Sequence, residues 1–185
     1  MNLSKEHNFV SAVIYVRNNA DTIKGMLEHV HTNFEKMFEQ YEIICVNDGS
    51  TDESENIIKN MAKEYDCAIS LVNMGYTQGV ELSMNAGEDL AIGDFIFEFD
   101  RAIVTWNDDM MEQIYRKMQE GYDIVSACPT SGIKASSKIF YSIFNKASHS
   151  ANKLKTESFR LISRRAIKKM NVLENINEMS KNDIK

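Results

Sequence analysis

The segment VNDGSTDES, Val46–Ser54, joins a predicted strand to a predicted helix. Tyr41–Val46, which leads into this segment and shares Val46 with it, is largely apolar and β-branched, as is typical of a buried strand. Asn47–Ser50 has the composition of a turn. Ser50–Glu53 then matches a capping box, so we predict that a helix begins there. The apolar residues that follow at helical spacing support this helix; they are Ile57, Ile58, Met61 and Tyr65.

The same order of a short apolar run and a longer amphipathic stretch recurs along the chain. The runs that predict strands are Phe9–Val16, Tyr41–Val46, Cys67–Val72, Phe95–Phe99, Tyr122–Ala127 and Ser158–Ile162. The stretches that predict helices are Ile23–Phe38 (capped by Asn19 or Asp21), Ser50–Tyr65, Thr77–Leu90, Asn107–Glu120, Ser136–His149 and one from Arg164. Because strands and helices of this length alternate in βαβ units, we expect an α/β fold. It would be a Rossmann-like three-layer sandwich with a mainly parallel central sheet.

Length, charge and cysteine content limit the possible functions. The chain has 185 residues, 43% of them hydrophobic, which fits a single domain over residues 1–173 with a polar, weakly ordered tail over 174–185. A formal net charge of -6 disfavours nucleic acid as a partner, because its binding needs a cationic face. The cysteines number 3 and lack metal-ligand spacing, which favours a reducing compartment. Without a signal peptide or a run of about 20 apolar residues, we expect a cytoplasmic protein.

Polar loops follow the predicted strands at their carboxyl ends, where ligands bind in parallel α/β sheets. Asp48 could accept hydrogen bonds from a base or a ribose, and Gly49 would let the backbone approach the ligand. The alternative is that Asn47–Asp52 is only a turn followed by a helix cap. Asn73–Gln78 follows the next strand in the same way.

The motifs also occur in an order that can be compared with known families. They are Val13–Asn19, Val46–Ser54, Asn73–Gly75, Asn85–Gly87, Ala91–Asp94 and Phe159–Arg165. Together they resemble the family 2 glycosyltransferases, which have the GT-A fold and bind nucleotide-diphospho-sugars. The closing FRLISRR looks like the branch that glycosylates a polyprenyl phosphate, as dolichol-phosphate mannosyltransferase does.

The resemblance implies a nucleotide-binding role for one set of residues. Asp48 would hold the base, the segment from Tyr15 to Asn19 would line the base and ribose, and the loop from Asn73 to Gln78 would close over the nucleotide. The sequence departs from the family at Tyr15, where proline is usual, and at Arg17, where tyrosine or a similar residue is usual. The residues implied are Tyr15, Arg17, Asn18, Asp48, Gly49, Asn73, Gly75 and Gln78.

The metal motif of the family is incomplete here. The family has Asp-x-Asp after the fourth strand, whereas this chain has Asp100-Arg101-Ala102. A divalent cation, Mg²⁺ or Mn²⁺, would need hard oxygen ligands, which alanine cannot supply. Three interpretations remain open: Arg101 replaces part of the cation's charge, Glu98 and Asp100 form a shifted metal site, or the domain has lost its reaction.

Carboxylates and arginines near the expected reaction centre complete the candidate site. Asp100 and Glu157 are the candidate catalytic carboxylates, although an ionised phosphate acceptor needs no base. The candidates for phosphate contact are Arg101, Arg160 and Arg164.

The resemblance therefore implies an inverting glycosyltransferase of cell-envelope polysaccharide synthesis. Its donor would be a nucleotide-diphospho-sugar, and its acceptor a polyprenyl phosphate or a glycan. The alternative is a catalytically impaired module that binds a nucleotide or a partner protein. A membrane-protein or homo-oligomer partner, and a peripheral position at the inner face of the membrane, would suit the polyprenyl-phosphate branch.

Overall fold

The computed structural model describes residues 5–128, 140–143 and 159–170. Its strands are β1 (Val10–Val16), β2 (Tyr41–Asn47), β3 (Ala68–Asn73), β4 (Phe95–Phe99), β5 (Ile124–Cys128), β6 (Phe140–Ile143) and β7 (Phe159–Ser163). Its helices are α1 (Ile23–Met37), α2 (Ser54–Glu64), α3 (Val80–Leu90) and α4 (Met110–Met118), and residues 164–170 are also helical. No helix in these ranges is long and apolar enough to cross a lipid bilayer.

The strands form one sheet in the order β3-β2-β1-β4-β7-β5-β6. β3, β2, β1 and β4 are parallel neighbours, while β7 lies antiparallel to both β4 and β5. β6 in turn pairs antiparallel with β5. Within the described residues, only β7 and β6 therefore run against the other strands, and the predicted mainly parallel sheet is confirmed.

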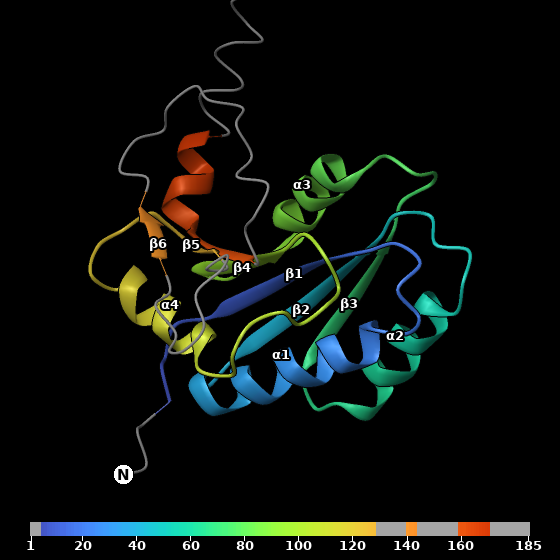
Figure 1. The fold of residues 1–185 in the computed structure, drawn as a ribbon, viewed down its shortest axis with the longest axis horizontal. Coiled ribbons are helices and arrows are strands. Elements are labelled where there is room, and N and C mark those ends of the chain that lie inside the picture. The colour runs from blue at the N-terminus through green and yellow to red at the C-terminus, as the bar shows by residue number, and fades with distance from the viewer. Residues whose placement is uncertain (1–4, 129–139, 144–158, 171–185) are drawn as a thin grey trace, which may run out of the picture.

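Two helical layers cover the sheet, as Figure 1 shows. On one face, α1, α2 and α4 pack on a cluster that includes Ile14, Phe34 and Phe97. On the other face, α3 and residues 164–170 pack on a smaller cluster that includes Val13 and Ile162. The period of two along each strand divides its side chains between these faces. The expected three-layer sandwich is thus present.

α3 lies unusually close to the sheet because of Gly87. A Cβ atom at this position would lie 2.4 Å from Val13 Cγ1 and 2.9 Å from Val46 Cγ2, closer than real Cβ contacts. Only a residue without a side chain lets the helix backbone approach β1 and β2 in this way.

Two sequence predictions are wrong in detail. Phe140–Ile143 forms β6 within the predicted helix Ser136–His149, because its aromatic and β-branched residues can complete the edge next to β5. The remainder of that predicted helix lies outside the described residues. The capping box also fails: α2 begins at Ser54, with no side-chain cap, and Ser50 instead accepts a hydrogen bond from another loop.

The first helix begins at Ile23 as predicted, but its predicted cap is wrong. The residue that precedes α1 is Thr22, and neither Asn19 nor Asp21 caps the helix with its side chain. Asn19 Oδ1 accepts a hydrogen bond from Arg17 N at 2.8 Å instead. Asn and Asp side chains accept hydrogen bonds from nearby backbone N–H groups both in turns and at helix N-caps. The residue type alone therefore does not distinguish a cap from a turn.

Candidate functional site

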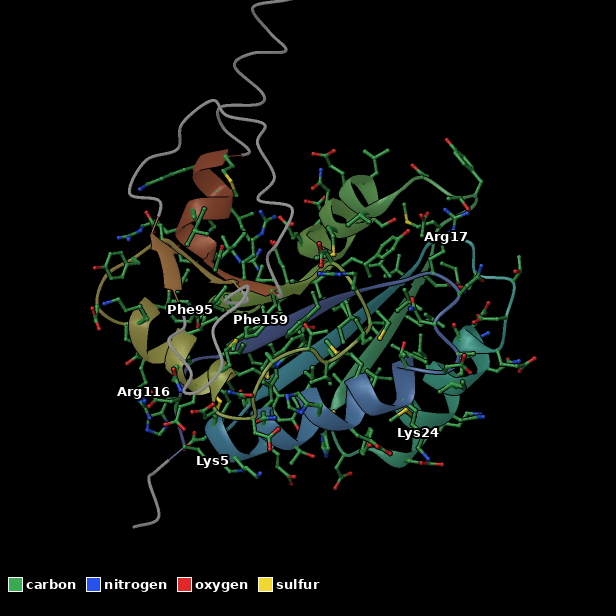
Figure 2. All side chains as sticks on the ribbon, in the orientation of Figure 1. Lys5, Arg17, Lys24, Phe95, Arg116 and Phe159 are labelled. Carbon is green, nitrogen blue, oxygen red and sulfur yellow. The ribbon has the colours of Figure 1, made fainter. Side chains whose placement is uncertain are left out.

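The carboxyl ends of β2, β1 and β4 meet at one edge of the sheet. β1 lies between the other two, with Val16 opposite Asn47 on β2 and Ile14 opposite Phe99 on β4. Asp48 and Asp100 follow directly on β2 and β4. They lie on the same edge, separated by about 10 Å across the strands, and Asp48 lies about two residues further along the strand direction than Asp100. In Figure 2, Arg17 lies at this end of the sheet, away from Lys5 and Arg116.

Asp48 lies at this edge, at the end of β2, and is fully buried. Its Oδ1 accepts a hydrogen bond from Gln78 N at 2.7 Å. Its Oδ2 accepts from Gly79 N at 2.9 Å and from the Tyr15 hydroxyl at 2.9 Å. Burial alone would raise the pKa of Asp48, but these donors stabilise the ionised form and together hold its pKa below the ordinary value. The carboxylate is therefore charged and ties the loop after β3 to the end of β2.

Hydrogen bonds between loops fix the positions of Asn18 and its neighbours. Asn18 N donates to Ser50 Oγ at 3.0 Å, and Asn18 Oδ1 accepts from Thr51 N at 2.8 Å. Asn18 has a positive φ of 51°, which asparagine tolerates better than most residues. Asn19 N donates to the buried Ser54 Oγ. The loops after β1 and β2 are thus joined by hydrogen bonds into one surface, and Arg17 is exposed on it.

The loop after β3 completes this surface. Asn73 Oδ1 accepts a hydrogen bond from Asn47 Nδ2 at 2.8 Å. Gly49, with a φ of 68°, lies under the loop, where a Cβ atom would be 3.1 Å from Thr77 Oγ1. Gly75 is exposed in the same loop, and Gln78 reaches Asp48 through its backbone. The structure thus brings the predicted nucleotide-binding residues together.

The three residues that stand where the family has its metal motif, Asp100, Arg101 and Ala102, lie in different surroundings after β4. Asp100 and Arg101 are exposed, and Asp100 Oδ1 lies 3.5 Å from Arg101 Nε. Ala102 is fully buried and belongs to the core cluster that also contains Phe99 and Trp106. A carboxylate at position 102 would therefore point into the apolar core in this arrangement.

Glu98 and Arg160 form an ion pair on the α3 side of the sheet. They lie opposite each other on β4 and β7, and Arg160 Nε bonds Glu98 Oε2. Glu98 is 3% exposed, and its Oε1 has no hydrogen-bond partner within the described part of the chain. Burial, and then the charge of Glu98, raises the pKa of Glu88 to about 9. Sequence reasoning missed Glu88, because its relevance depends on how α3 lies over β4.

The donor set at this edge does not fit a divalent cation. Among the described residues, no three His, Cys, Asp or Glu side chains form a group that could hold a metal ion. Of the two predicted ligands, Glu98 is buried against Arg160, and Asp100 is exposed beside Arg101. Both carboxylates thus have a cationic neighbour that would oppose a metal ion.

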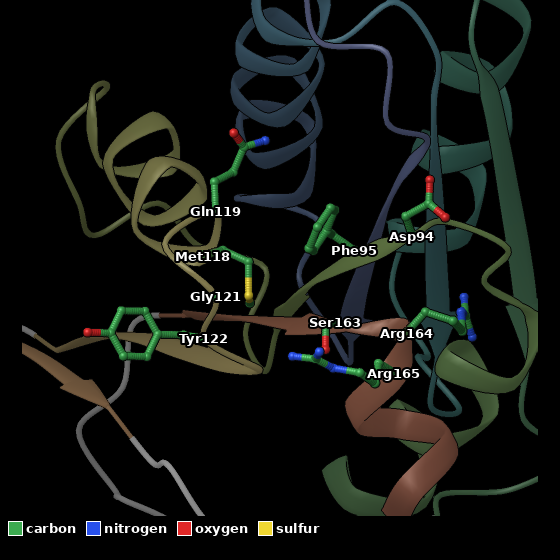
Figure 3. Close-up of a pocket in the computed structure, with 9 residues that line it drawn as sticks. All are labelled: Asp94, Phe95, Met118, Gln119, Gly121, Tyr122, Ser163, Arg164 and Arg165. Carbon is green, nitrogen blue, oxygen red and sulfur yellow. The ribbon is translucent and has the colours of Figure 1, made fainter.

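Arg164 does not reach this edge. It binds the carbonyl oxygens of Gly93 and Ala91, before β4 begins. There it lines a shallow pocket of about 540 Å³ together with Asp94 and Tyr122 (Figure 3). Its guanidinium thus joins the end of β7 to the loop after α3 at the opposite edge. Glu157, the other candidate catalytic carboxylate, lies outside the described residues.

Several solved structures have a similar fold. The mannosyltransferase PcManGT of Pyrobaculum calidifontis, solved with GDP-Man and Mn²⁺, matches 67% of this chain and 36% of its own with a TM-score of 0.57 and 18% identity. Residues 1–349 of TarS from S. aureus, solved with UDP, match 88% of this chain and 48% of their own with a TM-score of 0.62 and 14% identity. These likenesses confirm the predicted GT-A fold.

Sequence comparisons give the family. An uncharacterized glycosyltransferase of Synechocystis sp. is 29% identical over 85% of this chain and 51% of its own length. The undecaprenyl-phosphate 4-deoxy-4-formamido-L-arabinose transferase of Shewanella sediminis is 30% identical over 64% of this chain and 35% of its own. The chain thus spans about half or less of the length of these relatives. The sequence pattern described as glycosyl transferase family 2 matches residues 11–174, so the chain belongs to glycosyl transferase family 2.

Proposed function

We propose that the protein is an inverting glycosyltransferase of cell-envelope polysaccharide synthesis. Its donor is a nucleotide-diphospho-sugar, and its acceptor is a polyprenyl phosphate or a glycan. The observation that carries this proposal is the set of polar loops at the carboxyl edge of β2, β1 and β4 in a family 2 chain. The name of the Shewanella relative, an undecaprenyl-phosphate sugar transferase, favours the lipid-phosphate acceptor. An enzyme is therefore favoured over a module that only binds.

The edge divides into a nucleoside side and a phosphate side. Asn18, Asp48 and the loop after β3 lie by the ends of β1, β2 and β3 and suit the base and ribose. Arg101 and Arg160 lie by β4 and β7 and suit the diphosphate, because a guanidinium can donate two parallel hydrogen bonds to phosphate oxygens. The sugar would then sit near Asp100, between the diphosphate and the acceptor.

The chemistry proposed for this edge is a single displacement. An oxygen of the acceptor phosphate forms a bond to the anomeric carbon as the bond to the nucleoside diphosphate breaks. Inversion follows because the acceptor attacks opposite the leaving group. The acceptor oxygen is already ionised, so no proton has to be removed. Negative charge grows on the leaving diphosphate, where Arg101 and Arg160 can stabilise it. Arginines thus take up the charge that Mn²⁺ would neutralise.

Direct titration of nucleotides tests the donor side. We expect UDP or GDP to bind with and without Mn²⁺, as measured by calorimetry. Arg101→Ala should weaken nucleoside diphosphate binding about tenfold but change nucleoside binding little, because it removes only a phosphate contact. Lys24→Ala removes the same charge from an exposed position on α1 and is the matched control. An equal effect of both variants would exclude a specific role for Arg101.

Transfer itself is tested with undecaprenyl phosphate and a panel of UDP- and GDP-sugars. We expect nucleoside diphosphate to be released only when donor and acceptor are both present. Nucleotide binding without transfer to either a lipid phosphate or a glycan would contradict the enzyme and favour the binding module. We also propose that the protein associates peripherally with the membrane, so the assay should include vesicles.

A further inference from the structure

The donors around Asp48 leave its carboxylate little capacity for a further partner in this structure. Its side chain is fully buried, and it accepts hydrogen bonds from Gln78 N, Gly79 N and the Tyr15 hydroxyl. A carboxylate offers about four acceptor positions, so these donors use most of its capacity. A nucleotide base can therefore reach Asp48 only when some of these donors leave.

The loop that supplies two of these donors is otherwise loosely held. Tyr76 at its tip is 72% exposed, and no atom lies within 4 Å of a Cβ built on Gly75 or Gly79. Its other described hydrogen bonds are Thr77 Oγ1 to Asp48 O at 3.4 Å, Met74 N to Asn47 O at 3.0 Å and Ser83 N to Gly79 O at 3.2 Å. The first residue of the loop, Met74, also packs against the smaller core cluster. The contacts to Asp48 are thus the main restraint on residues 75–79.

Gly79 gives this loop a natural pivot. It precedes α3 and has a φ of +90°, which glycine adopts readily and other residues rarely adopt. The loop can thus swing at its junction with α3 without unwinding the helix. Such a movement would uncover Asp48 and leave the exposed ring of Tyr76 beside the opening, where it could stack on a heterocycle.

We propose that Tyr15, Gln78 and Gly79 form a latch on Asp48 that the nucleotide base must displace. This inference rests on the proposed function, because it assumes that the base binds at Asp48. In this latch, Tyr15 is a positioning residue. Its hydroxyl orients the Asp48 carboxylate so that the carboxylate accepts the hydrogen bonds from Gln78 N and Gly79 N. The free protein then exists mainly in a closed state, in which the loop covers Asp48. Its apparent nucleotide affinity equals the affinity of the open state multiplied by the fraction of molecules that are open.

Tyr15→Phe separates the latch from direct binding. The variant keeps the aromatic ring and removes only the hydroxyl that donates to Asp48 Oδ2. If the latch restrains the loop, Tyr15→Phe should bind UDP or GDP severalfold more tightly than the parent. If the hydroxyl contacts the nucleotide instead, the variant should bind more weakly, and the latch is overturned. Unchanged affinity would also count against it.

Amide hydrogen exchange of the parent protein, followed by NMR, provides a test without any substitution. Saturating UDP or GDP should speed exchange at the Gln78 and Gly79 amides, because both lose Asp48 as acceptor. The Asp48 amide donates to Val16 O at 2.9 Å and should not change, so it is the internal control. Binding with equal or slower exchange at Gln78 and Gly79 would overturn the latch alone. Absence of binding at millimolar nucleotide would overturn the proposed function and the latch together.

Discussion

Glu88 shows how a single side chain can set the response of the protein to pH. Burial, followed by the neighbouring Glu98, raises the pKa of Glu88 to about 9 from its ordinary value of 4.5. The folded protein therefore holds a proton between these values that the unfolded chain releases. Because the folded state binds more protons there, stability should fall as pH rises from about 5 to about 9.

Glu88→Gln should remove much of this pH dependence. The amide is neutral at every pH and can still donate a hydrogen bond to Glu98, as a protonated carboxyl does. Urea unfolding at pH 5, 7 and 9 measures the effect. Glu81→Gln, at an exposed position on the same helix, should keep the slope of the parent. A slope in Glu88→Gln equal to that of the parent would show that Glu88 is ionised in the folded protein.

Ala102 shows why the metal motif cannot be restored by one substitution. The side chain is fully buried in the apolar core, so Ala102→Asp would bury a carboxylate without a partner. We expect a loss of about 3 kcal/mol in unfolding free energy and no Mn²⁺-dependent nucleotide binding. Ile103→Asp is the control, since Ile103 is 42% exposed and should lose only about 0.5 kcal/mol. A stable Ala102→Asp protein that binds UDP only with Mn²⁺ would contradict the buried position.

At the scale of elements, the position of α3 on the sheet depends on Gly87. Gly87→Ala would press a methyl group into Val13 and Val46, which belong to neighbouring strands. We expect a loss of about 1–3 kcal/mol in unfolding free energy, because overpacking displaces the helix.

Gly25→Ala is the matched control: Gly25 lies within α1, and nothing lies within 4 Å of the added Cβ. That variant should gain about 0.5–1 kcal/mol in urea unfolding, because alanine favours the helix. Equal effects of both variants would mean that α3 is not tightly packed at Gly87.

Periodicity predicts the elements of this chain better than capping signals predict their ends. β1, β2 and β4 have nearly the predicted limits, because long apolar runs in a buried sheet leave little choice. The capping box failed because Ser50, Asp52 and Ser54 form hydrogen bonds with the loop after β1. Such contacts join residues more than thirty positions apart, and no local pattern reveals them.

At the scale of the whole molecule, the sequence predicted where most site residues gather. Asp48, Asn73 and Asp100 follow parallel strands, so topology alone brings them to one edge. The sequence could not predict the contact of Glu88 with Glu98, because that contact depends on the packing of α3. Nor could it predict that Arg164 lies at the opposite edge. Side-chain direction and helix placement are properties of the packed molecule, and residue type does not specify them.

The proposed reaction requires a nucleotide to bind at the carboxyl edge of β2, β1 and β4. Backbone NMR spectra recorded during titration with UDP and GDP test it directly. We predict that shift changes concentrate at residues 15–19, 47–49, 73–79 and 100–101. Changes that concentrate instead around Tyr122 and Arg164, in the pocket at the opposite edge, would contradict binding at this edge. So would the absence of any changes at millimolar nucleotide.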